Sequence, residues 1–336
     1  MKYINVCSIL LLCWVLTASA PADRSAEQPF FVQQLAPGVW AAIHNDKGGH
    51  AICNAGIIDL GNQTLIFDCF INPDAAARLK QTAEELTGRP VTYVVNSHYH
   101  DDHIRGNQEF SPGTVIISTQ KTRERMQVSE PEEQAYAKEH NAAQVIKAKQ
   151  QYESTTGEAK EEALMWLAYF EAIKQSLPGL HTVLPGVTFQ DSLRINGSKN
   201  NVLLKEFTNA HTLSDAVLFV PDAGIVFTGD VLFVNRHPWL GDGNPDKLEQ
   251  YLLQLANDPK LQTYVPGHGP VGDKSQVVRM VRYISEMRQS ATEAVKNNIP
   301  DSVFIKQEVP AEFKPWWFGR FYKPNLDFFY KQVKGN

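Results

Sequence analysis

The segment His98-Tyr-His-Asp-Asp-His103 concentrates side chains that can bind metal ions. Three imidazoles and two carboxylates fall within six residues, and burying so many polar groups is costly unless a partner satisfies them. In an extended segment His98 and His100 point to the same side, because side chains alternate with a period of two. Asp102 and His103 follow and can face a second ion. The spacing therefore predicts that this run supplies ligands to two adjacent metal sites.

Further candidate ligands occur singly at the ends of short apolar runs. His211 follows the strand-like residues 202–208, and Asp230 follows residues 225–228. His268 lies in Tyr-Val-Pro-Gly-His-Gly-Pro, after another apolar run. Strand ends are where open α/β architectures place their chemistry. Imidazole and carboxylate ligands without thiolate suit zinc, with iron or manganese as alternatives.

These motifs resemble those of the metallo-β-lactamase superfamily of binuclear metallohydrolases, in the same order and over roughly residues 32–270. The resemblance implies two zinc ions with three groups of ligands: His98, His100 and His211 for the first ion, Asp102, His103 and His268 for the second, and Asp230 as the bridge. The alternative interpretation is a surface loop that is rich in His and Asp by chance. The combined run and single ligands favour the metal centre.

The implied chemistry is hydrolysis. A hydroxide bridging two zinc ions is available at neutral pH because the metal lowers the pKa of bound water to about 7. It would attack the activated carbonyl of a small molecule such as a lactone, ester, thioester or β-lactam, with Asp102 orienting the nucleophile. The centre would keep a charge of about +1, which favours anionic substrates.

Asp230 departs from the pattern of the true β-lactamases of the superfamily and resembles the lactonase, thioesterase and phosphodiesterase branches. It therefore argues against a β-lactam as the natural substrate. A phosphodiesterase using the same two metals is the alternative enzyme. A metal-binding module without turnover is a further alternative from another class.

Other residues are candidates for supporting roles. Asp68 and Asp215 are expected to hold ligand imidazoles from behind, with a turn or capping carboxylate as the alternative for each. Candidates for the substrate pocket are His44, His50, His237 and Trp239. The histidines could equally be structural.

The composition is that of one enzyme domain preceded by an export signal. The chain has 336 residues, 43% of them hydrophobic, and a net charge of −5 without a basic stripe, which excludes nucleic acid as an expected partner. Residues 1–22 read as a signal peptide, with Lys2, an apolar stretch at residues 6–16 and cleavage after Ala22. We expect a periplasmic or secreted protein without a stable membrane anchor after cleavage; a retained anchor is the alternative. The oligomeric state is not specified by the sequence.

Two cysteines, Cys53 and Cys69, remain after signal removal. They lie in the strand-like residues 51–59 and 64–70, on either side of a turn, and an exported protein could oxidise them. A disulfide between them is therefore a hypothesis, because the register of the hairpin is not fixed by the sequence.

The pattern of elements gives the fold class. Strands are expected over residues 31–70, 91–97, 115–118 and 193–228, and helices over residues 75–87 and 277–297. The resemblance implies an α/β fold, a four-layer αββα sandwich of two mixed β-sheets, over residues 23–336. Residues 119–180 read as a helical insertion that either covers the active site or decorates the surface. Residues 274–336 read as a helix and an aromatic tail, which is strapped across the domain, forms a dimer contact or lines the pocket.

Overall fold

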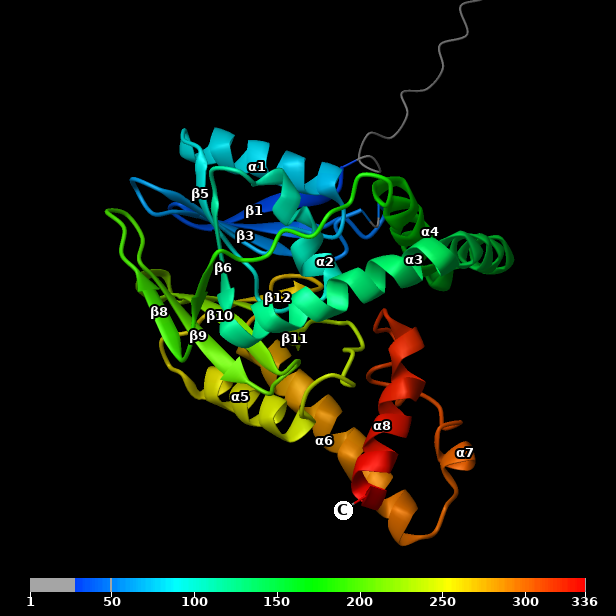
Figure 1. Cartoon of the computed structure of the whole chain (residues 1–336). Helices are drawn as coiled ribbons and strands as arrows, with labels where there is room; N and C mark the ends of the chain where they lie inside the picture. The colour runs from blue at the N-terminus through cyan, green and yellow to red at the C-terminus, as the bar shows by residue number, and fades with distance from the viewer. Residues whose placement is uncertain (1–27, 49, 336) are drawn as a thin grey trace, which may run out of the picture.

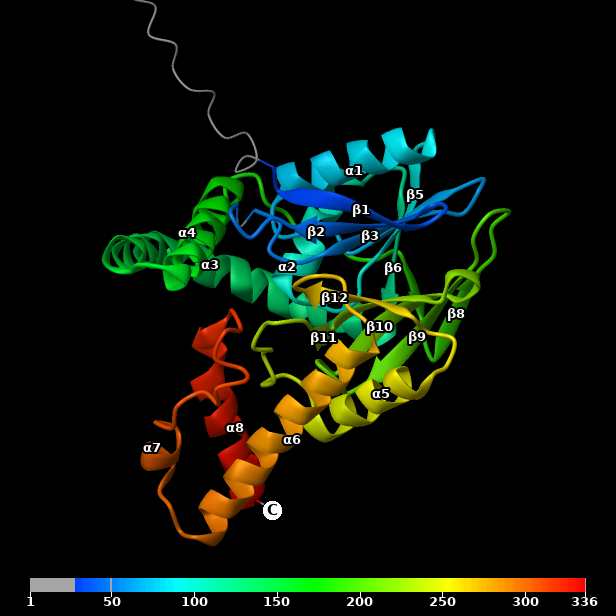
Figure 2. The same cartoon turned by 180° about the vertical axis from the view of Figure 1, so that it is seen from behind.

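The computed structural model describes residues 28–48 and 50–335, so the expected signal peptide lies outside the described residues. Two β-sheets pack against each other, and helices cover their outer faces (Figures 1 and 2). No helix in the described ranges is long and apolar enough to cross a membrane.

The first sheet has seven strands that follow one another in sequence order. Its first four strands pair antiparallel, and its later strands pair parallel. The strands are β1 (Phe30–Ala36), β2 (Val39–His44), β3 (Ala55–Asp59), β4 (Thr64–Phe67), β5 (Val91–Val95), β6 (Val115–Thr119) and β7 (Val187–Phe189).

The second sheet has five strands in the order β12-β11-β10-β9-β8, and only the β11–β12 pair is parallel. Its strands are β8 (Ser192–Ile195), β9 (Val202–Thr208), β10 (Ser214–Val220), β11 (Ile225–Phe233) and β12 (Thr263–His268).

Three apolar clusters mark the layers. One lies between the sheets and joins residues such as Ile58 and Val95 of the first sheet to Leu218 of the second. Another joins the first sheet to helix α1 (Pro73–Thr87), and the third joins the second sheet to α5 (Pro245–Asn257) and α6 (Lys274–Lys296). The order is helix, sheet, sheet, helix, which confirms the αββα sandwich.

Local signals explain where α1 begins and ends. The side chain of Asn72 accepts hydrogen bonds from the backbone N–H groups of Asp74 and Ala75, which caps the first turn. Gly88 ends the helix at φ 72°, a left-handed conformation that glycine adopts without strain. α1 thereby covers the outer face of the first sheet, close to the expected residues 75–87.

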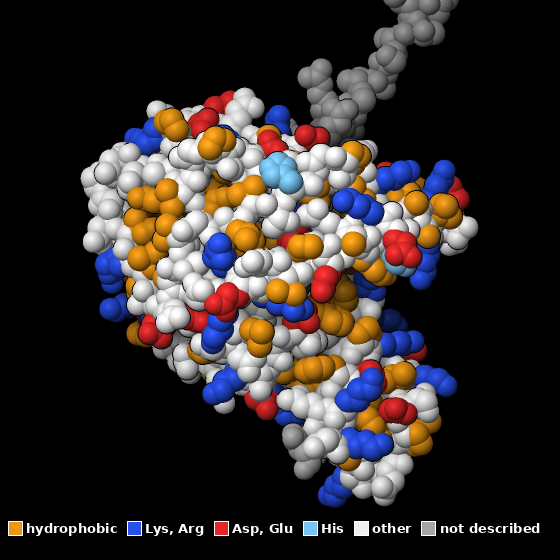
Figure 3. Space-filling model, in the orientation of Figure 1, with side chains coloured by type: hydrophobic (Ala, Val, Ile, Leu, Met, Phe, Trp, Pro, Cys, Tyr) orange, Lys and Arg blue, Asp and Glu red, His pale blue; other side chains and the backbone are white. Residues whose placement is uncertain are grey.

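Two helical additions project from the sandwich. The helix pair consists of α3 (Gln120–Ser154) and α4 (Glu158–Ser176), within the expected insertion. The C-terminal module comprises α6, α7 (Asp301–Phe304), the short 3-10 helix η3 (Gly319–Phe321) and α8 (Tyr322–Gly335). In the space-filling view the surface is indented between these two additions (Figure 3).

The structure corrects several strand boundaries, among them the start of the strand expected at residues 51–59. The strand-like residues 51–59 form a strand only from Ala55, because the preceding residues make a tight loop. Ile52 in this loop has φ 59°, a left-handed conformation that is unusual for a β-branched residue. Its N–H donates to Nδ1 of His44 at 3.0 Å, and this bond helps to hold the loop in place.

Candidate metal centre

The histidine–aspartate run lies between the end of a strand and a short helix. β5 ends at Val95, and α2 (Asp101–Ile104) begins after His100, which occupies the position before its first turn. His98 and His103 are fully buried. The ring of His103 stays 4.3 Å from that of His98, yet its ligand nitrogen belongs to a different cluster of donor atoms from those of His98 and His100.

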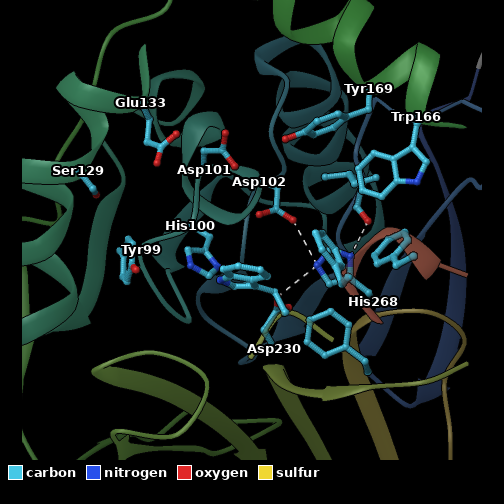
Figure 4. A pocket seen from close by; sticks show the side chains of 15 residues that line it. Tyr99, His100, Asp101, Asp102, Ser129, Glu133, Trp166, Tyr169, Asp230 and His268 are labelled. Atoms are coloured by element: carbon cyan, nitrogen blue, oxygen red, sulfur yellow. Dashed lines mark hydrogen bonds and ion pairs between the residues drawn. The ribbon is translucent and has the colours of Figure 1, made fainter. Parts of the chain in front are cut away.

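The second sheet supplies the other candidate ligands. His211 lies in the loop from β9 to β10, Asp230 lies in the second half of β11, and His268 is the last residue of β12. All three are almost completely buried. The candidate site therefore lies where the ends of both sheets meet, and Figure 4 shows Asp102, Asp230 and His268 pointing toward one another.

The first cluster consists of His98, His100, His211 and Asp230, whose ligand atoms all lie within 4.8 Å of one another. His100 Nδ1 is 3.2 Å from His211 Nε2. Asp230 Oδ2 is 3.4 Å from His211 Nε2 and 3.9 Å from His98 Nε2. Four donor atoms at these separations can surround one small divalent cation.

The second cluster shares Asp230 with the first. His103, Asp230 and His268 also offer atoms within 4.8 Å of one another. Asp230 Oδ1 is 3.2 Å from His103 Nε2, and Asp230 Oδ2 is 3.4 Å from His268 Nε2. Asp102 Oδ2 is 3.5 Å from His103 Nε2 and 3.3 Å from His268 Nε2. Among the described residues, Asp230 is thus the carboxylate that belongs to both clusters and is placed to bridge two ions.

Buried polar atoms without hydrogen-bond partners test whether these residues fit metal ions. His98 Nε2, His103 Nε2 and Asp230 Oδ1 are all buried and form no hydrogen bond, although His103 Nε2 and Asp230 Oδ1 lie at an ion-pair distance of 3.2 Å. Leaving such atoms unsatisfied is costly, and bound cations would satisfy all three. The donor set of imidazoles and carboxylates therefore fits two divalent cations.

Burial and mutual charge set the pKa values of the cluster. Burial lowers the pKa of His98, and it lowers that of His211 to about 3. Burial also opposes the charged form of His268, but Asp230 and Asp102 raise its pKa to about 9. Despite burial, the His103 and His268 charges bring the pKa of Asp102 to about 2. Ionised carboxylates next to imidazoles are the donor set in which a cation replaces protons.

Groups behind the imidazoles fix their orientation. Asp68 was predicted for this role, and its Oδ2 lies 2.8 Å from Nδ1 of His103. The same carboxylate accepts the backbone N–H of Ser97 at 2.7 Å. His268 Nδ1 lies 2.9 Å from the carbonyl oxygen of Ile52. Each contact occupies Nδ1 and leaves Nε2 directed toward the clusters.

Asp242 is a supporting residue that the sequence did not reveal. Its Oδ2 lies 3.0 Å from Nε2 of His100 and accepts a hydrogen bond from Nε1 of Trp239 at 2.7 Å. This contact occupies Nε2 of His100 and leaves Nδ1 for the first cluster. The only signal in the sequence is Gly-Asp-Gly shortly after Asp230, which reads as a turn.

Asp215 does not play the predicted role. Its carboxylate accepts hydrogen bonds from the backbone N–H of Thr212 at 3.0 Å and from its hydroxyl at 2.9 Å, and no imidazole in the described chain donates to it. Burial raises its pKa to about 7. The alternative assignment holds, since the carboxylate stabilises the turn that presents His211.

A cavity opens beside the two clusters and is described below. Three of the four residues predicted to line a substrate pocket do not line this cavity. His44 is buried in β2 and accepts from Ile52, and His50 lies outside the lining residues. His237 is buried beneath the C-terminal module, with Nδ1 2.9 Å from the hydroxyl of Tyr283. These three side chains are not among the residues that line this cavity, so the structure gives no support for their expected contact with substrate. Trp239 does line the cavity.

The predicted disulfide is absent, since Cys53 and Cys69 are both free, buried thiols. Cys53 Sγ donates to the backbone oxygen of Asp102 at 2.9 Å, and Cys69 Sγ donates to Oδ1 of Asn107 at 3.1 Å. The β3–β4 pairing runs only from Gly56 to Asp59 on one strand, so Cys53 lies outside the hairpin ladder.

A cavity of about 260 Å³ opens beside the two clusters, and we call it the inner cavity. His100, Asp102, Asp230 and His268 form part of its lining. Its walls are strongly aromatic, with rings from the histidine run, β11, the helix pair and the C-terminal module: Tyr99, Trp166, Tyr169, Phe233, Trp239, Phe318 and Phe321. The helix pair and the aromatic tail therefore both shape the candidate site.

Comparisons with known proteins agree with this arrangement of fold and site. The family model of the metallo-beta-lactamase superfamily matches residues 48–268. A metallo-beta-lactamase from Pontibacter korlensis is 16% identical with a TM-score of 0.52, covering 76% of this chain and 99% of its own. The metallo-beta-lactamase FIM-1 from Pseudomonas aeruginosa, solved in a mono-zinc form, is 15% identical with a TM-score of 0.53, covering 77% and 96%.

A third structure extends the likeness to the helical additions. The inverting sec-alkylsulfatase Pisa1 from Pseudomonas sp. is 14% identical with a TM-score of 0.63. The match covers 93% of this chain and 52% of that protein, so this chain spans about half of its length. At these identities the three structures establish the fold alone.

An αββα sandwich with a cluster of imidazoles and carboxylates at the meeting ends of its sheets defines a class of proteins that are mostly metal-dependent hydrolases. With the family model matching well over half of its length, the chain belongs to the metallo-β-lactamase superfamily. This membership confirms the resemblance found in the sequence.

Proposed function

We propose that this chain is an exported, binuclear zinc-dependent hydrolase that cleaves the activated carbonyl of a small molecule. The observation that supports this proposal is the position of Asp230, which belongs to both ligand clusters and also lines the inner cavity. Such a shared carboxylate would hold two ions side by side at the wall of a cavity in which a substrate fits.

In the proposed reaction each residue has a defined task. His98, His100 and His211 would hold one ion, and Asp102, His103 and His268 the other. Two bound zinc ions would polarise the carbonyl of the substrate and lower the pKa of a bound water molecule to about 7. Asp102 lines the cavity with an ionised carboxylate, so it can accept a hydrogen bond from the attacking water and orient it.

The walls of the cavity favour a substrate with an apolar or aromatic body. No Lys or Arg side chain appears among the described residues that line it, whereas Asp101 and Glu133 do. Any negative charge next to the reacting carbonyl would therefore be recognised by the metal centre. Lactones, esters and thioesters meet these conditions.

A hydrolysis panel on zinc-loaded protein tests the proposal. It should contain lactones, thioesters, aryl esters, nitrocefin, bis(p-nitrophenyl) phosphate and secondary alkyl sulfates, the last because one structural neighbour is described as an alkylsulfatase. We expect turnover of at least one carbonyl class. Cleavage of the phosphodiester or the sulfate ester alone would overturn the assignment.

Metal analysis tests the binuclear centre separately. We expect about two equivalents of zinc per chain, and fewer than about 1.5 after gentle purification would count against two sites. The variant His103→Ala should lose one equivalent together with activity. If it keeps two metal ions and full turnover, the ligand assignment is wrong.

Export has its own readout. When the full-length chain is expressed with its natural N-terminus, we expect the mature protein to begin at Asp23, outside the cytoplasm. N-terminal sequencing of the fractionated protein checks this, and an intact residue 1 in the membrane fraction would favour a retained anchor.

A further inference from the structure

A second cavity adjoins the inner cavity on the other side of Trp166. This outer cavity has a volume of about 480 Å³, larger than the inner one, and Trp166 lines both. Its walls come from α3, α4 and the residues Gly319 and Arg320 of η3. It lies between the helix pair and the C-terminal module, where Figure 3 shows the indented surface.

A chain of aromatic rings joins the metal ligands to the outer cavity. The ring of His268 lies 5.3 Å from that of Phe318, which lies 5.1 Å from that of Trp166. Trp166 in turn lies 6.5 Å from Phe170, a residue of the outer wall. An apolar chain could follow this surface from one cavity to the other without leaving aromatic contact.

Glu162 fixes the aromatic partition between the cavities. Its Oε1 accepts hydrogen bonds from Nε1 of Trp166 at 3.1 Å and from the backbone N–H of Phe318 at 2.7 Å. One carboxylate thereby ties α4 to the C-terminal module. Glu162 is also the only acidic residue in the described lining of the outer cavity, and its charge is engaged in these bonds.

Two cations in the outer cavity have no acidic partner. The guanidinium carbon of Arg320 lies 4.7 Å from the ring centre of Trp166 and 5.7 Å from that of Phe170. Lys147 of α3 lines the same cavity. Among the described residues neither cation forms an ion pair, although Lys149 on the same helix pairs with Glu153. Small apolar side chains, Ala148 and Ala163, complete the wall.

We propose that the two cavities bind one elongated acyl substrate that carries an anionic group at the end remote from the reacting carbonyl. This inference rests on the proposed hydrolase function. The carbonyl lies at the metal ligands, the chain passes Trp166, and the anionic end lies between Lys147 and Arg320. The described lining of the inner cavity contains no Lys or Arg side chain, and its histidines are candidate metal ligands, so the distal charge is recognised in the outer cavity.

Calorimetry on the zinc-loaded full chain tests this proposal with linear carboxylic acids as probes. Each pair of probes consists of a dicarboxylate and the monocarboxylate of equal length, and the pairs form a series of increasing length. In both members of a pair, one carboxylate is expected to bind at the metal ions. At lengths that span both cavities, the dicarboxylate should bind about tenfold more tightly, as expected for one added charge-assisted contact. The double variant Lys147→Gln/Arg320→Gln should lose this advantage and keep its affinity for the monocarboxylate.

A matched control variant is Lys149→Gln, which removes an exposed charge from α3 outside the cavity and should leave both affinities unchanged. If dicarboxylates show no advantage at any length, or keep it in the double variant, the proposal is overturned. The corresponding p-nitrophenyl esters separate the two proposals. Hydrolysis that ignores the distal charge contradicts the extended site alone, whereas charge-dependent binding without any hydrolysis supports the extended site and contradicts the hydrolase.

Discussion

At the scale of single residues, the candidate metal centre depends on hydrogen bonds to the far side of its ligands. Asp68 holds His103, Asp242 holds His100, and the carbonyl of Ile52 holds His268. Each of these partners leaves one ring nitrogen directed at the clusters. The orientation of the ligands is thus built into the fold, and metal binding need not pay for it in lost side-chain freedom.

We therefore predict that Asp242→Asn and Asp68→Asn each weaken a different zinc ion. Loss of the carboxylate removes the group that fixes the tautomer and orientation of one imidazole, which lowers metal affinity about 10–100-fold. Competition with a chromophoric chelator measures the affinity for each zinc ion. Asp242→Asn should weaken the ion at the first cluster, and Asp68→Asn should weaken the ion at the second cluster. As a control, Asp222→Asn alters an exposed carboxylate of the second sheet's η2 (Pro221–Ala223) and should change neither affinity. Equal affinities in all variants would contradict the role of these carboxylates.

The sequence was sufficient to identify the candidate metal ligands themselves. The dense run at residues 98–103 and the single ligands at strand ends are local signals, and the structure brings all of them together. Asp242 could not be found in this way, because its partner His100 lies 142 residues away. Asp215 was misassigned because a buried carboxylate that caps a turn has the same spacing as one that holds an imidazole.

At the scale of elements, a buried arginine connects the metal-binding loop to the helix pair. Arg105 follows α2, and its side chain is 1% exposed. It lies 3.0 Å from Asp101, next to the ligand Asp102, and 3.4 Å from Glu130 on α3. Burial alone would lower the pKa of Arg105, but these two acids outweigh it and keep the guanidinium charged.

The variant Arg105→Met should lower the free energy of unfolding by about 3–5 kcal/mol, because it leaves the buried Glu130 and the partly buried Asp101 without their partner. Urea denaturation followed by circular dichroism measures the change. The exposed i,i+4 pair of Lys149 and Glu153 offers a comparison, since Lys149→Met should cost at most about 0.5 kcal/mol. A similarly small loss for Arg105→Met would mean that α2 and α3 are not coupled through this residue.

A buried histidine makes the C-terminal module sensitive to acid. Burial lowers the pKa of His237 from 6.5 to about 4, beneath the rings of Tyr283, Trp316 and Tyr322. Below pH 6.5 the unfolded chain takes up a proton that the folded chain does not, so the free energy of unfolding falls between pH 6.5 and about 4. The full effect is roughly 3 kcal/mol.

We predict that His237→Phe, which keeps a ring of similar size, removes this part of the acid dependence. Unfolding of chelator-treated wild-type and variant protein should be compared at about pH 7.5 and about pH 4.5, so that metal loss does not contribute. Relative to the wild type, the variant should have a higher free energy of unfolding at the lower pH than at the higher pH. A constant difference would show that His237 is not kept neutral by burial.

The sequence predicted the elements with regular periodicity better than those set by tertiary contacts. α1 and β9 begin and end close to the expected residues, since apolar patterns and turn residues mark them, whereas β11 begins as expected but continues past residue 228 to Phe233 and includes Asp230. Residues 51–53 read as strand because their side chains are apolar, yet His44 and His268 hold Ile52 in a left-handed turn. The aromatic tail gave no helical signal, although α8 forms within it and packs against α6.

At the scale of the whole molecule, metal binding at the candidate centre would be linked to the stability of the sandwich. Both sheets contribute candidate ligands, so a bound ion would join the two halves of the fold. The buried atoms of His98, His103 and Asp230 that form no hydrogen bond add a cost that bound cations would remove.

Removal of zinc should therefore lower the stability of the entire domain. Binding to the folded chain alone contributes about 2.7 kcal/mol for each site when zinc is present at about 100 times its dissociation constant. Thermal unfolding with and without a chelator measures the loss, and re-addition of zinc should reverse it. An unchanged melting temperature would argue that the centre is not occupied in the folded protein.

The order of the cavity walls along the chain has a consequence for how the protein is made. All seven candidate ligands precede residue 269, whereas Phe318 and Phe321, which close the inner cavity, belong to the last part of the chain. During synthesis the metal-binding residues are therefore complete well before the pocket that selects a substrate. A chain cut short after α6 would carry all the candidate ligands beside a cavity that lacks one wall. The ability to bind metal would therefore arise before the ability to select a substrate, which depends on the C-terminal residues.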